Sequence, residues 1–112
     1  MNFEDLKDKV LRWADDKDLL HAENADKQFM KFIEEVFEFK TEMDGLNEYG
    51  ANPLTYFDLC LEMGDIFVTL IILCEQIGID PEECLSMAYE KIKNRRGRTI
   101  NGCFVKDEDL DE

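Results

Sequence analysis

The 112-residue sequence predicts an all-α fold, an antiparallel four-helix bundle-like domain with a C-terminal tail that is extended or partly disordered from about residue 99. Four segments repeat apolar residues at the spacing of an amphipathic helix. Residues that begin and end helices flank these segments, and the short loops between them favour antiparallel neighbours. No strand-rich region is present. A chain of this length has room for one domain, so we expect residues 1–112 to form a single unit.

The first helix is predicted from its cap and its apolar face. Asn2 can cap a helix whose first turn contains Glu4 and Asp5, and acids are favoured at this positive end. The helix should end in the charge cluster at residues 14–18. Its apolar face is formed by Phe3, Leu6, Val10 and Trp13.

The second helix is predicted to run from Asn24 or Asp26 to Met43. Gly45 and residues 47–52 are rich in turn-forming side chains and should form a loop. The acids of this helix stand opposite its apolar face or at the edge of that face. Taken alone, they would fit a solvated surface: Glu34, Glu35, Glu38 and Glu42.

The third helix should begin after Asn52 and end at Gly78. Asparagine before Pro53 is a typical helix start, and glycine is a typical residue just past a helix end. Apolar side chains surround almost the whole helix, which predicts that it is largely buried. Its most apolar run, residues 66–74, is far shorter than the roughly 20 residues that cross a bilayer.

The fourth helix should begin with the capping box of residues 80–83 and run to about Arg96, where Gly97 stops it. Residues 99–105 are too short and too rich in glycine for another helix. Residues 106–112 form an acidic tail. We therefore expect a short extended end to the chain, with room for one small strand.

Composition limits the class of partner. The chain carries 13 Lys and Arg against 27 Asp and Glu, a net charge of −14, which argues against binding nucleic acid or an anionic membrane. A phosphate ligand would need a cation between it and the protein. The start of the chain lacks the basic and apolar segments of a secretory signal. The four cysteines form no CxxC pair, so reduced thiols and a cytoplasmic location are expected.

A polar stripe on the third helix predicts a metal site. Asp58, Glu62, Asp65 and Thr69 follow one another at steps of four, three and four residues, so they lie on one face of an apolar helix. Carboxylates buried without a cation are costly unless they are protonated, paired or bound to a metal. The alternative is that this stripe is the one wet edge of the helix.

Two acidic pairs can meet across an antiparallel interface, Glu35-x-x-Glu38 and Glu62-x-x-Asp65. Four carboxylates make an all-oxygen site that suits Mg²⁺, with Mn²⁺ also possible, whereas structural Zn²⁺ prefers thiols and imidazoles. A di-iron centre would need Glu-x-x-His pairs, and the single histidine, His21, stands in no such motif.

The two motifs resemble those of a known family. Residues 31–38, KFIEEVFE, are similar to the ExxE motif of the MazG-like members of the all-alpha NTP pyrophosphatase superfamily, and residues 61–66, LEMGDI, to its ExxD motif. This superfamily is related to the dimeric dUTPases and dCTP pyrophosphatases. The resemblance covers Leu11 to Leu110 and includes Trp13 and residues 91–98. Phe37 and Phe39 depart from the family pattern, which often has a small residue between the second and third glutamates.

The resemblance implies an activity and an assembly. Members hydrolyse a (deoxy)nucleoside triphosphate to the monophosphate and pyrophosphate and so clean the nucleotide pool. It implies Mg²⁺ bound by Glu35, Glu38, Glu62 and Asp65, and a homodimer or homotetramer. The preferred base is not implied. For the general base we expect Glu34, or a ligand carboxylate such as Glu35 or Glu38 that has a spare oxygen.

Substrate contacts are expected from basic and amide side chains. Lys91, Lys93 and Arg95 or Arg96 would hold phosphate oxygens, although positive charge is also favoured at any helix C-terminus. The resemblance suggests that Asn94 reads the base or the sugar. Lys31 is another phosphate candidate or an ion-pair partner of Glu35. Candidates for contacts to the nucleoside are Trp13, which could equally be a core residue, Asn24 and Gln28.

Two alternatives stay open. A non-catalytic helical interaction module could use the same carboxylates to bind a metal structurally, or bind none. A dUTP- or dCTP-specific pyrophosphatase would share the whole site and differ only in its base pocket.

Overall fold

The computed structural model describes residues 1–50 and 52–110, and these divide into two compact units, Met1–Asp80 and Pro81–Glu112. Across the described ranges the chain has four α-helices and one two-stranded sheet, so its mainly helical character is confirmed. Each unit is described by itself. The four-helix bundle arrangement and the single domain stay predictions.

The first unit begins with α1 (Phe3–Asp16), and the predicted cap is confirmed. The Asn2 side chain accepts a hydrogen bond from the backbone N–H of Asp5 at 2.9 Å. After the helix the chain turns at Asp18, whose φ is 61°, and passes through a short 3₁₀ helix at Ala22–Asn24. This turn leads into the second long helix.

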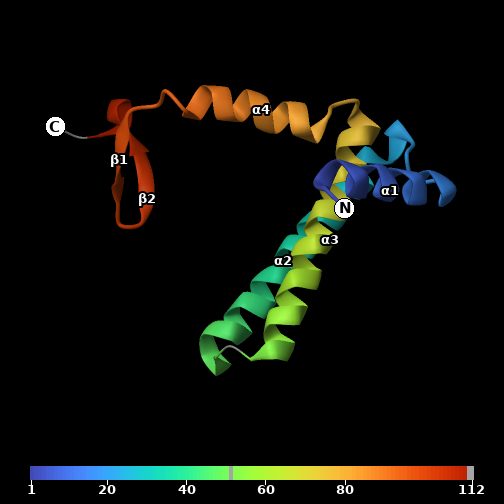
Figure 1. Cartoon of the computed structure of the whole chain (residues 1–112), viewed down its shortest axis with the longest axis horizontal. Helices are drawn as coiled ribbons and strands as arrows, with labels where there is room; N and C mark the ends of the chain where they lie inside the picture. Colours follow the sequence, from blue (N-terminus) through green and yellow to red (C-terminus); the bar gives the residue numbers. More distant parts are fainter. Residues whose placement is uncertain (51, 111–112) are drawn as a thin grey trace. The chain divides into compact units, whose positions relative to one another are not determined.

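Helices α2 (Ala25–Tyr49) and α3 (Pro53–Ile77) lie side by side as an antiparallel hairpin (Figure 1). α2 is longer than predicted and continues through Gly45, so the loop prediction is wrong for Gly45 and for residues 47–49. A glycine inside a helix costs only about 1 kcal/mol relative to alanine. Packing of the flanking turn, where Leu46 is half-buried, can offset that cost. Ala51, also in the predicted loop, lies outside the described residues.

Both predicted ends of α3 are confirmed. The Asn52 side chain accepts a hydrogen bond from the backbone N–H of Thr55 at 3.0 Å. At the other end Gly78 has a left-handed φ of 80°, and the N–H of Ile79 donates to the carbonyl of Cys74 at 2.9 Å. Glycine is favoured here because a side chain would strain this backbone.

The core of the first unit is small and lies where α1 packs on the C-terminal half of α3. Its buried apolar residues are Ala14, Ile71, Ile72 and Cys74. The rings of Phe3 and Phe67 meet edge to face there, with centroids 6.0 Å apart. The N-terminal half of α3 is less buried than its sequence predicts. Leu61, for example, is exposed in this chain.

The second unit consists of α4 (Pro81–Ile92), an antiparallel hairpin of β1 (Gly97–Ile100) and β2 (Cys103–Lys106), and a 3₁₀ turn at Asp107–Asp109. α4 ends at Ile92, four residues earlier than the end predicted at about Arg96. The extended end of the chain is therefore a hairpin whose turn, Asn101-Gly102, has positive φ at both residues. Turns of this kind are common in two-residue hairpins because their backbone twist matches that of the flanking strands.

Gly97 permits a close approach inside this hairpin. A Cβ atom at this position would collide with the carbonyl oxygen of Val105 and lie 2.7 Å from Cζ of Phe104. Gly97 pairs with Lys106 in the strand register. The absence of a side chain at Gly97 therefore lets the end of β2 lie close to the start of β1.

No helix in the described ranges combines the length and the apolar character needed to cross a membrane.

Candidate metal centre

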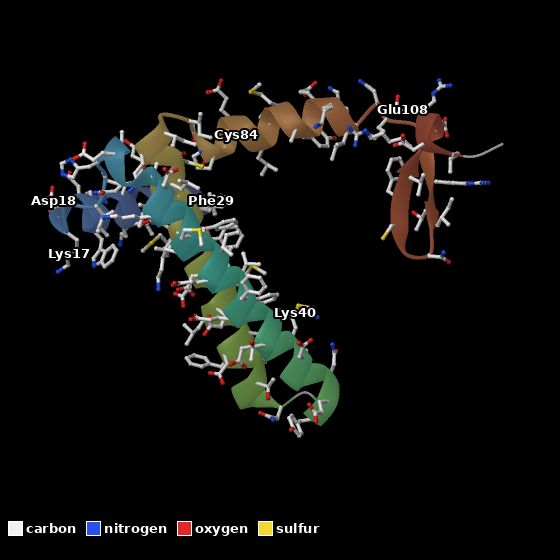
Figure 2. The ribbon with its side chains drawn as sticks, turned by 180° about the vertical axis from the view of Figure 1, so that it is seen from behind. Lys17, Asp18, Phe29, Lys40, Cys84 and Glu108 are labelled. Carbon is white, nitrogen blue, oxygen red and sulfur yellow. The ribbon has the colours of Figure 1, made fainter. Side chains whose placement is uncertain are left out.

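The hairpin of α2 and α3 turns the Glu35 carboxylate inward and the Phe37 ring outward. Glu35 is 6% exposed, whereas Phe37, two residues further along α2, is 67% exposed. Figure 2 shows side chains projecting from the hairpin, Phe29 among them, and Phe29 is about half exposed. Glu35 is therefore not part of a solvated helix face, whereas Glu34 and Glu38 are exposed.

Three of the expected metal ligands converge. One carboxylate oxygen from each of Glu35, Glu62 and Asp65 lies within 4.8 Å of the other two. Glu62 and Asp65 share a face of α3 because they are three residues apart, and Glu35 faces them from α2. Glu35 is buried, Glu62 is half-buried and Asp65 is exposed, so the cluster is open to solvent on one side.

Glu38 lies beside this cluster. A hydrogen bond with Glu35 raises the pKa of the Glu38 carboxyl, and the negative charge of Glu35, partial burial and the charge of Glu62 raise it further. Lys31 opposes this effect. A cation bound to these carboxylates would oppose this rise in pKa, because it favours their charged forms.

Two oxygen atoms of the cluster lack partners. Oε2 of Glu35 and Oε2 of Glu62 are buried and accept no hydrogen bond from any described residue. Lys31 Nζ pairs with the other oxygen of Glu35, Oε1, at 3.3 Å, and this contact is the main reason that the pKa of Lys31 is raised. One exposed lysine does not neutralise this group of acids.

The donor set fits a hard divalent cation. Mg²⁺ and Mn²⁺ prefer carboxylate oxygens, and buried carboxylates without partners are unfavourable until a cation binds. Glu35, Glu62 and Asp65 would supply the first ligands, and Glu38 is placed to join them. Binding of Mg²⁺ itself stays a prediction.

Two other predicted residues on α2 lie at the edge of the site. Glu34 is exposed and pairs with Lys31 at 3.5 Å, outside the carboxylate cluster. Lys31 bridges Glu34 and Glu35, which is the ion-pair alternative to a phosphate contact. The positions of Glu34 and Lys31 therefore do not by themselves indicate a general base or a phosphate contact.

The residues expected to contact the nucleoside line two separate cavities of about 320 Å³ each. Trp13 is half-exposed and, with Leu6, Val10 and Val68, forms an apolar cavity, so it is not a core residue. The other cavity, which we name the amide cavity, is lined by Leu19, Asn24, Lys27, Gln28 and Gln76. The sequence analysis did not single out Gln76.

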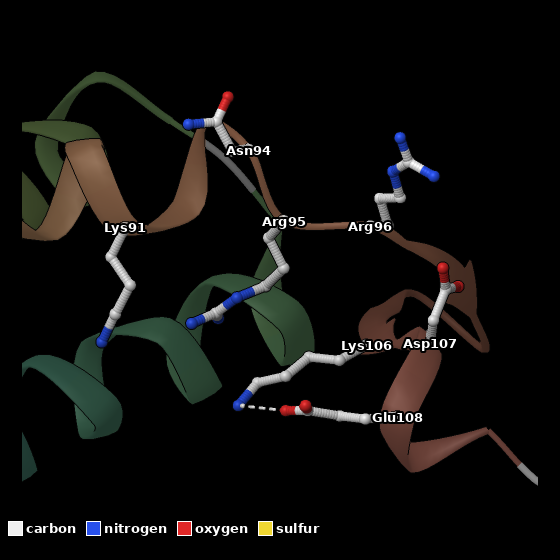
Figure 3. A pocket seen from close by; sticks show the side chains of 7 residues that line it. All are labelled: Lys91, Asn94, Arg95, Arg96, Lys106, Asp107 and Glu108. Atoms are coloured by element: carbon white, nitrogen blue, oxygen red, sulfur yellow. Dashed lines mark ion pairs between the residues drawn. The ribbon is translucent and has the colours of Figure 1, made fainter.

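The second unit contains a basic cavity of about 440 Å³ (Figure 3). Four predicted residues line it, whereas Lys93 does not and pairs with Glu90 at 2.6 Å. Lys106 Nζ pairs with Glu108 Oε1 at 3.5 Å. The sequence analysis did not single out the other three lining residues, Lys106, Asp107 and Glu108. The Asn101-Gly102 pair could have indicated the hairpin that leads to them. The full lining is Lys91, Asn94, Arg95, Arg96, Lys106, Asp107 and Glu108.

Comparison with known proteins gives no further assignment. No family model matches the chain, and neither a curated protein nor a solved structure matches it. Membership of the MazG-like family therefore stays a prediction based on the two acidic motifs.

Proposed function

We propose that this chain is a Mg²⁺-dependent nucleoside triphosphate pyrophosphohydrolase of the MazG-like type. The observation that carries the proposal is the convergence of Glu35, Glu62 and Asp65 from two helices, with two buried oxygens that have no partner among the described residues. A cation offsets the repulsion between an acidic protein and a triphosphate, and this cluster is suited to hold one.

The chain's own residues would share the work as follows. Bound Mg²⁺ would neutralise phosphate charge and make a phosphorus atom more electrophilic. Glu38, beside Glu35 and exposed to solvent, can accept the proton of the attacking water. We prefer Glu38 to Glu34 as general base because Glu34 is paired with Lys31 away from the cluster.

The basic cavity of the second unit supports an anionic substrate. Lys91, Arg95 and Lys106 extend toward one side of this cavity (Figure 3). Their charges are suited to phosphate oxygens, and arginine binds such oxygens in a bidentate way. We propose that this cavity, taken by itself, is a site for phosphate oxygens. The four cysteines all lie in the described ranges and none is in a disulfide, which supports the proposal of a cytoplasmic location.

A panel of ribo- and deoxyribonucleoside triphosphates tests the proposal. With Mg²⁺, phosphate should appear only when inorganic pyrophosphatase is added, because the direct product is pyrophosphate. Phosphate released without that enzyme would indicate a phosphatase. Absence of turnover on every substrate would overturn the enzymatic function and favour the metal-binding interaction module.

The same panel separates a general pyrophosphohydrolase from a specialist. Turnover confined to dUTP or to dCTP would identify the narrower enzyme, since both share the metal site and differ in base recognition. The exposed aromatic face of α2 is the observation that favours an interaction module, and binding of Mg²⁺ without turnover would be its signature.

A further inference from the structure

The polar interface between α2 and α3 extends beyond the carboxylates. Gln28 and Asn24 precede Glu35 by seven and eleven residues, and Gln76 follows Asp65 by eleven. Both spacings return to nearly the same helical face, so these amides continue the two acidic stripes. Seven residues correspond to about 10 Å along a helix. The interface is therefore acidic at one end and amide-lined at the other.

The amide cavity lies at this second end. Three of its five lining residues are the amides Asn24, Gln28 and Gln76, and the others are Lys27 and Leu19. No carboxylate of the described residues lines it. Hydrogen-bonding groups beside an apolar wall fit a flat polar ring better than they fit a metal ion.

Gln76 has an unused acceptor. The side chain is 5% exposed, and its Nε2 donates to the carbonyl oxygen of Leu19 at 2.7 Å. This contact identifies Oε1 as the atom left without a donor, because a carbonyl accepts only from the nitrogen. Oε1 is buried and has no partner among the described residues. Buried amide oxygens are normally satisfied, so a donor is missing here.

We propose that the amide cavity binds the nucleobase of the substrate and that Gln76 is a specificity-determining residue, which rests on the proposed function. Oε1 of Gln76 accepts a hydrogen bond from an N–H group on the edge of the base, after a small rotation of the side chain. Leu19 packs against the ring. Buried hydrogen-bonding groups discriminate strongly, because a base without the matching donor leaves the acceptor unpaired.

Substrate preference tests the role of Gln76. Gln76→Met keeps the size of the side chain and removes the amide, and Thr69→Val is its control. Thr69 is a buried residue of the same stripe that does not line the cavity, and its hydroxyl donates to its own helix, at Ile66 O. Its backbone carbonyl accepts from Nε2 of Gln28 at 3.3 Å, and the change to valine keeps that carbonyl. We expect Gln76→Met to raise KM for the preferred base by up to about tenfold, the value of one uncharged hydrogen bond.

The expected pattern is specific. Gln76→Met should change kcat little and narrow the difference in kcat/KM between bases, while Thr69→Val keeps the wild-type preference. A merely structural role would lower Tm without changing the order of the bases. The proposal would be overturned if the wild-type enzyme hydrolysed the triphosphates of all bases equally well. It would also be overturned if Gln76→Met kept the wild-type base preference.

Binding without turnover separates this proposal from the proposed function. In EDTA, nucleoside monophosphates added to the wild-type chain should shift the side-chain amide NMR signals of Gln76, Asn24 and Gln28. Ribose 5-phosphate, which lacks the base, should not shift them. These signals need no variant, so a misfolded Gln76→Met would not decide the matter.

The outcomes are distinguishable. Base-dependent shifts in a protein that hydrolyses no triphosphate would support the nucleobase site and overturn the enzymatic function. Turnover with no base-dependent shift at Gln76 would leave the enzyme intact and overturn the site. If neither turnover nor shifts are seen, both proposals fail.

Discussion

Glu34 and Glu35 are neighbours in the chain with opposite environments. A step of one residue rotates the side chain by about 100° around α2, which places Glu34 at the surface and Glu35 in the interface with α3. Lys31 can contact both because it lies three and four residues before them. The chemistry of the site depends on this rotation, since only the inward acid meets Glu62 and Asp65.

The sequence predicts which acids pair but not how deeply each is buried. Spacing alone placed Glu62 and Asp65 on one face, because that follows from helix geometry. The burial of Glu35 depends on which face α2 turns to α3, a long-range choice that its own amphipathic pattern does not fix. Gln76 was missed for the same reason. Its hydrogen bond to Leu19, which occupies Nε2 and leaves Oε1 unpaired, depends on long-range packing that the sequence does not give.

At the level of single residues, Asp65→Asn should remove activity and keep the fold. The change takes away one negative ligand at the exposed edge of the cluster, where no packing is lost. We expect kcat to fall by at least about a hundredfold, the upper range for disturbing the surroundings of a metal site. Far-UV circular dichroism should stay near wild type.

Asp44→Asn is the matched control for Asp65→Asn. Asp44 lies on the same hairpin but pairs with Lys40 at 2.9 Å, outside the cluster, so its activity should be unchanged. Glu38→Gln should behave like Asp65→Asn. A near-normal kcat in either site variant would show that the metal centre is misplaced.

The raised pKa of Glu38 predicts a pH dependence of stability. Because the folded metal-free protein holds this proton more tightly than the unfolded chain does, its free energy of unfolding should decrease as pH rises from the ordinary glutamate range through the raised pKa. Mg²⁺ binds the deprotonated form and should remove this decrease. Urea unfolding at several pH values, in EDTA and in Mg²⁺, measures both effects.

Glu38→Gln isolates this contribution. His21, whose pKa is raised by its hydrogen bond with Asp18 and by the charge of that residue, also loses stabilising charge as pH rises, but in a higher range. That titration is common to both proteins and cancels in their difference. Identical pH slopes for wild type and Glu38→Gln in EDTA would contradict the prediction.

At the scale of elements, local signals predicted the boundaries of α1 and α3 correctly. The caps at Asn2 and Asn52 and the stop at Gly78 depend on a few adjacent residues. The continuation of α2 past Gly45 and the early end of α4 are not visible in the local residue pattern. No local signal reports how closely Gly97 approaches Val105 across the hairpin.

Gly45→Ala tests the extension of α2. Gly45 lies inside the helix, and an added Cβ would meet no heavy atom within 4 Å. Alanine should therefore raise the free energy of unfolding by about 0.5–1 kcal/mol, the difference in helix propensity. Chemical denaturation measures the change. A loop at Gly45, as its sequence context indicates, would give no gain.

Gly97→Ala should have the opposite outcome. The methyl group collides with backbone of β2, so the hairpin must open or shift. We expect faster amide hydrogen exchange at residues 103–106 and loss of Lys106 from the basic cavity. Gly45→Ala serves as the comparison, because it adds the same methyl group where there is space. Unchanged exchange in β2 would contradict the close approach.

At the scale of the whole molecule, α2 carries a set of large apolar side chains that are exposed in this chain. Phe29, Met30, Val36, Phe37 and Met43 on α2 are all exposed. The buried apolar core of the described residues is only Ala14, Ile71, Ile72 and Cys74. A contiguous exposed apolar surface of this kind is typical of an interface. These features support the proposal that the protein is a homodimer or homotetramer.

Light scattering at micromolar concentration should give a mass that is a multiple of the 13.1 kDa chain. Phe37→Asp places a charge on the exposed face of α2 and should shift the protein toward the monomer, whereas Phe37→Leu keeps the apolar contact and the assembly. The net charge of −14 on every copy opposes association, and salt screens this repulsion. The wild-type assembly should therefore weaken at low ionic strength, and a monomer at every salt concentration would refute it.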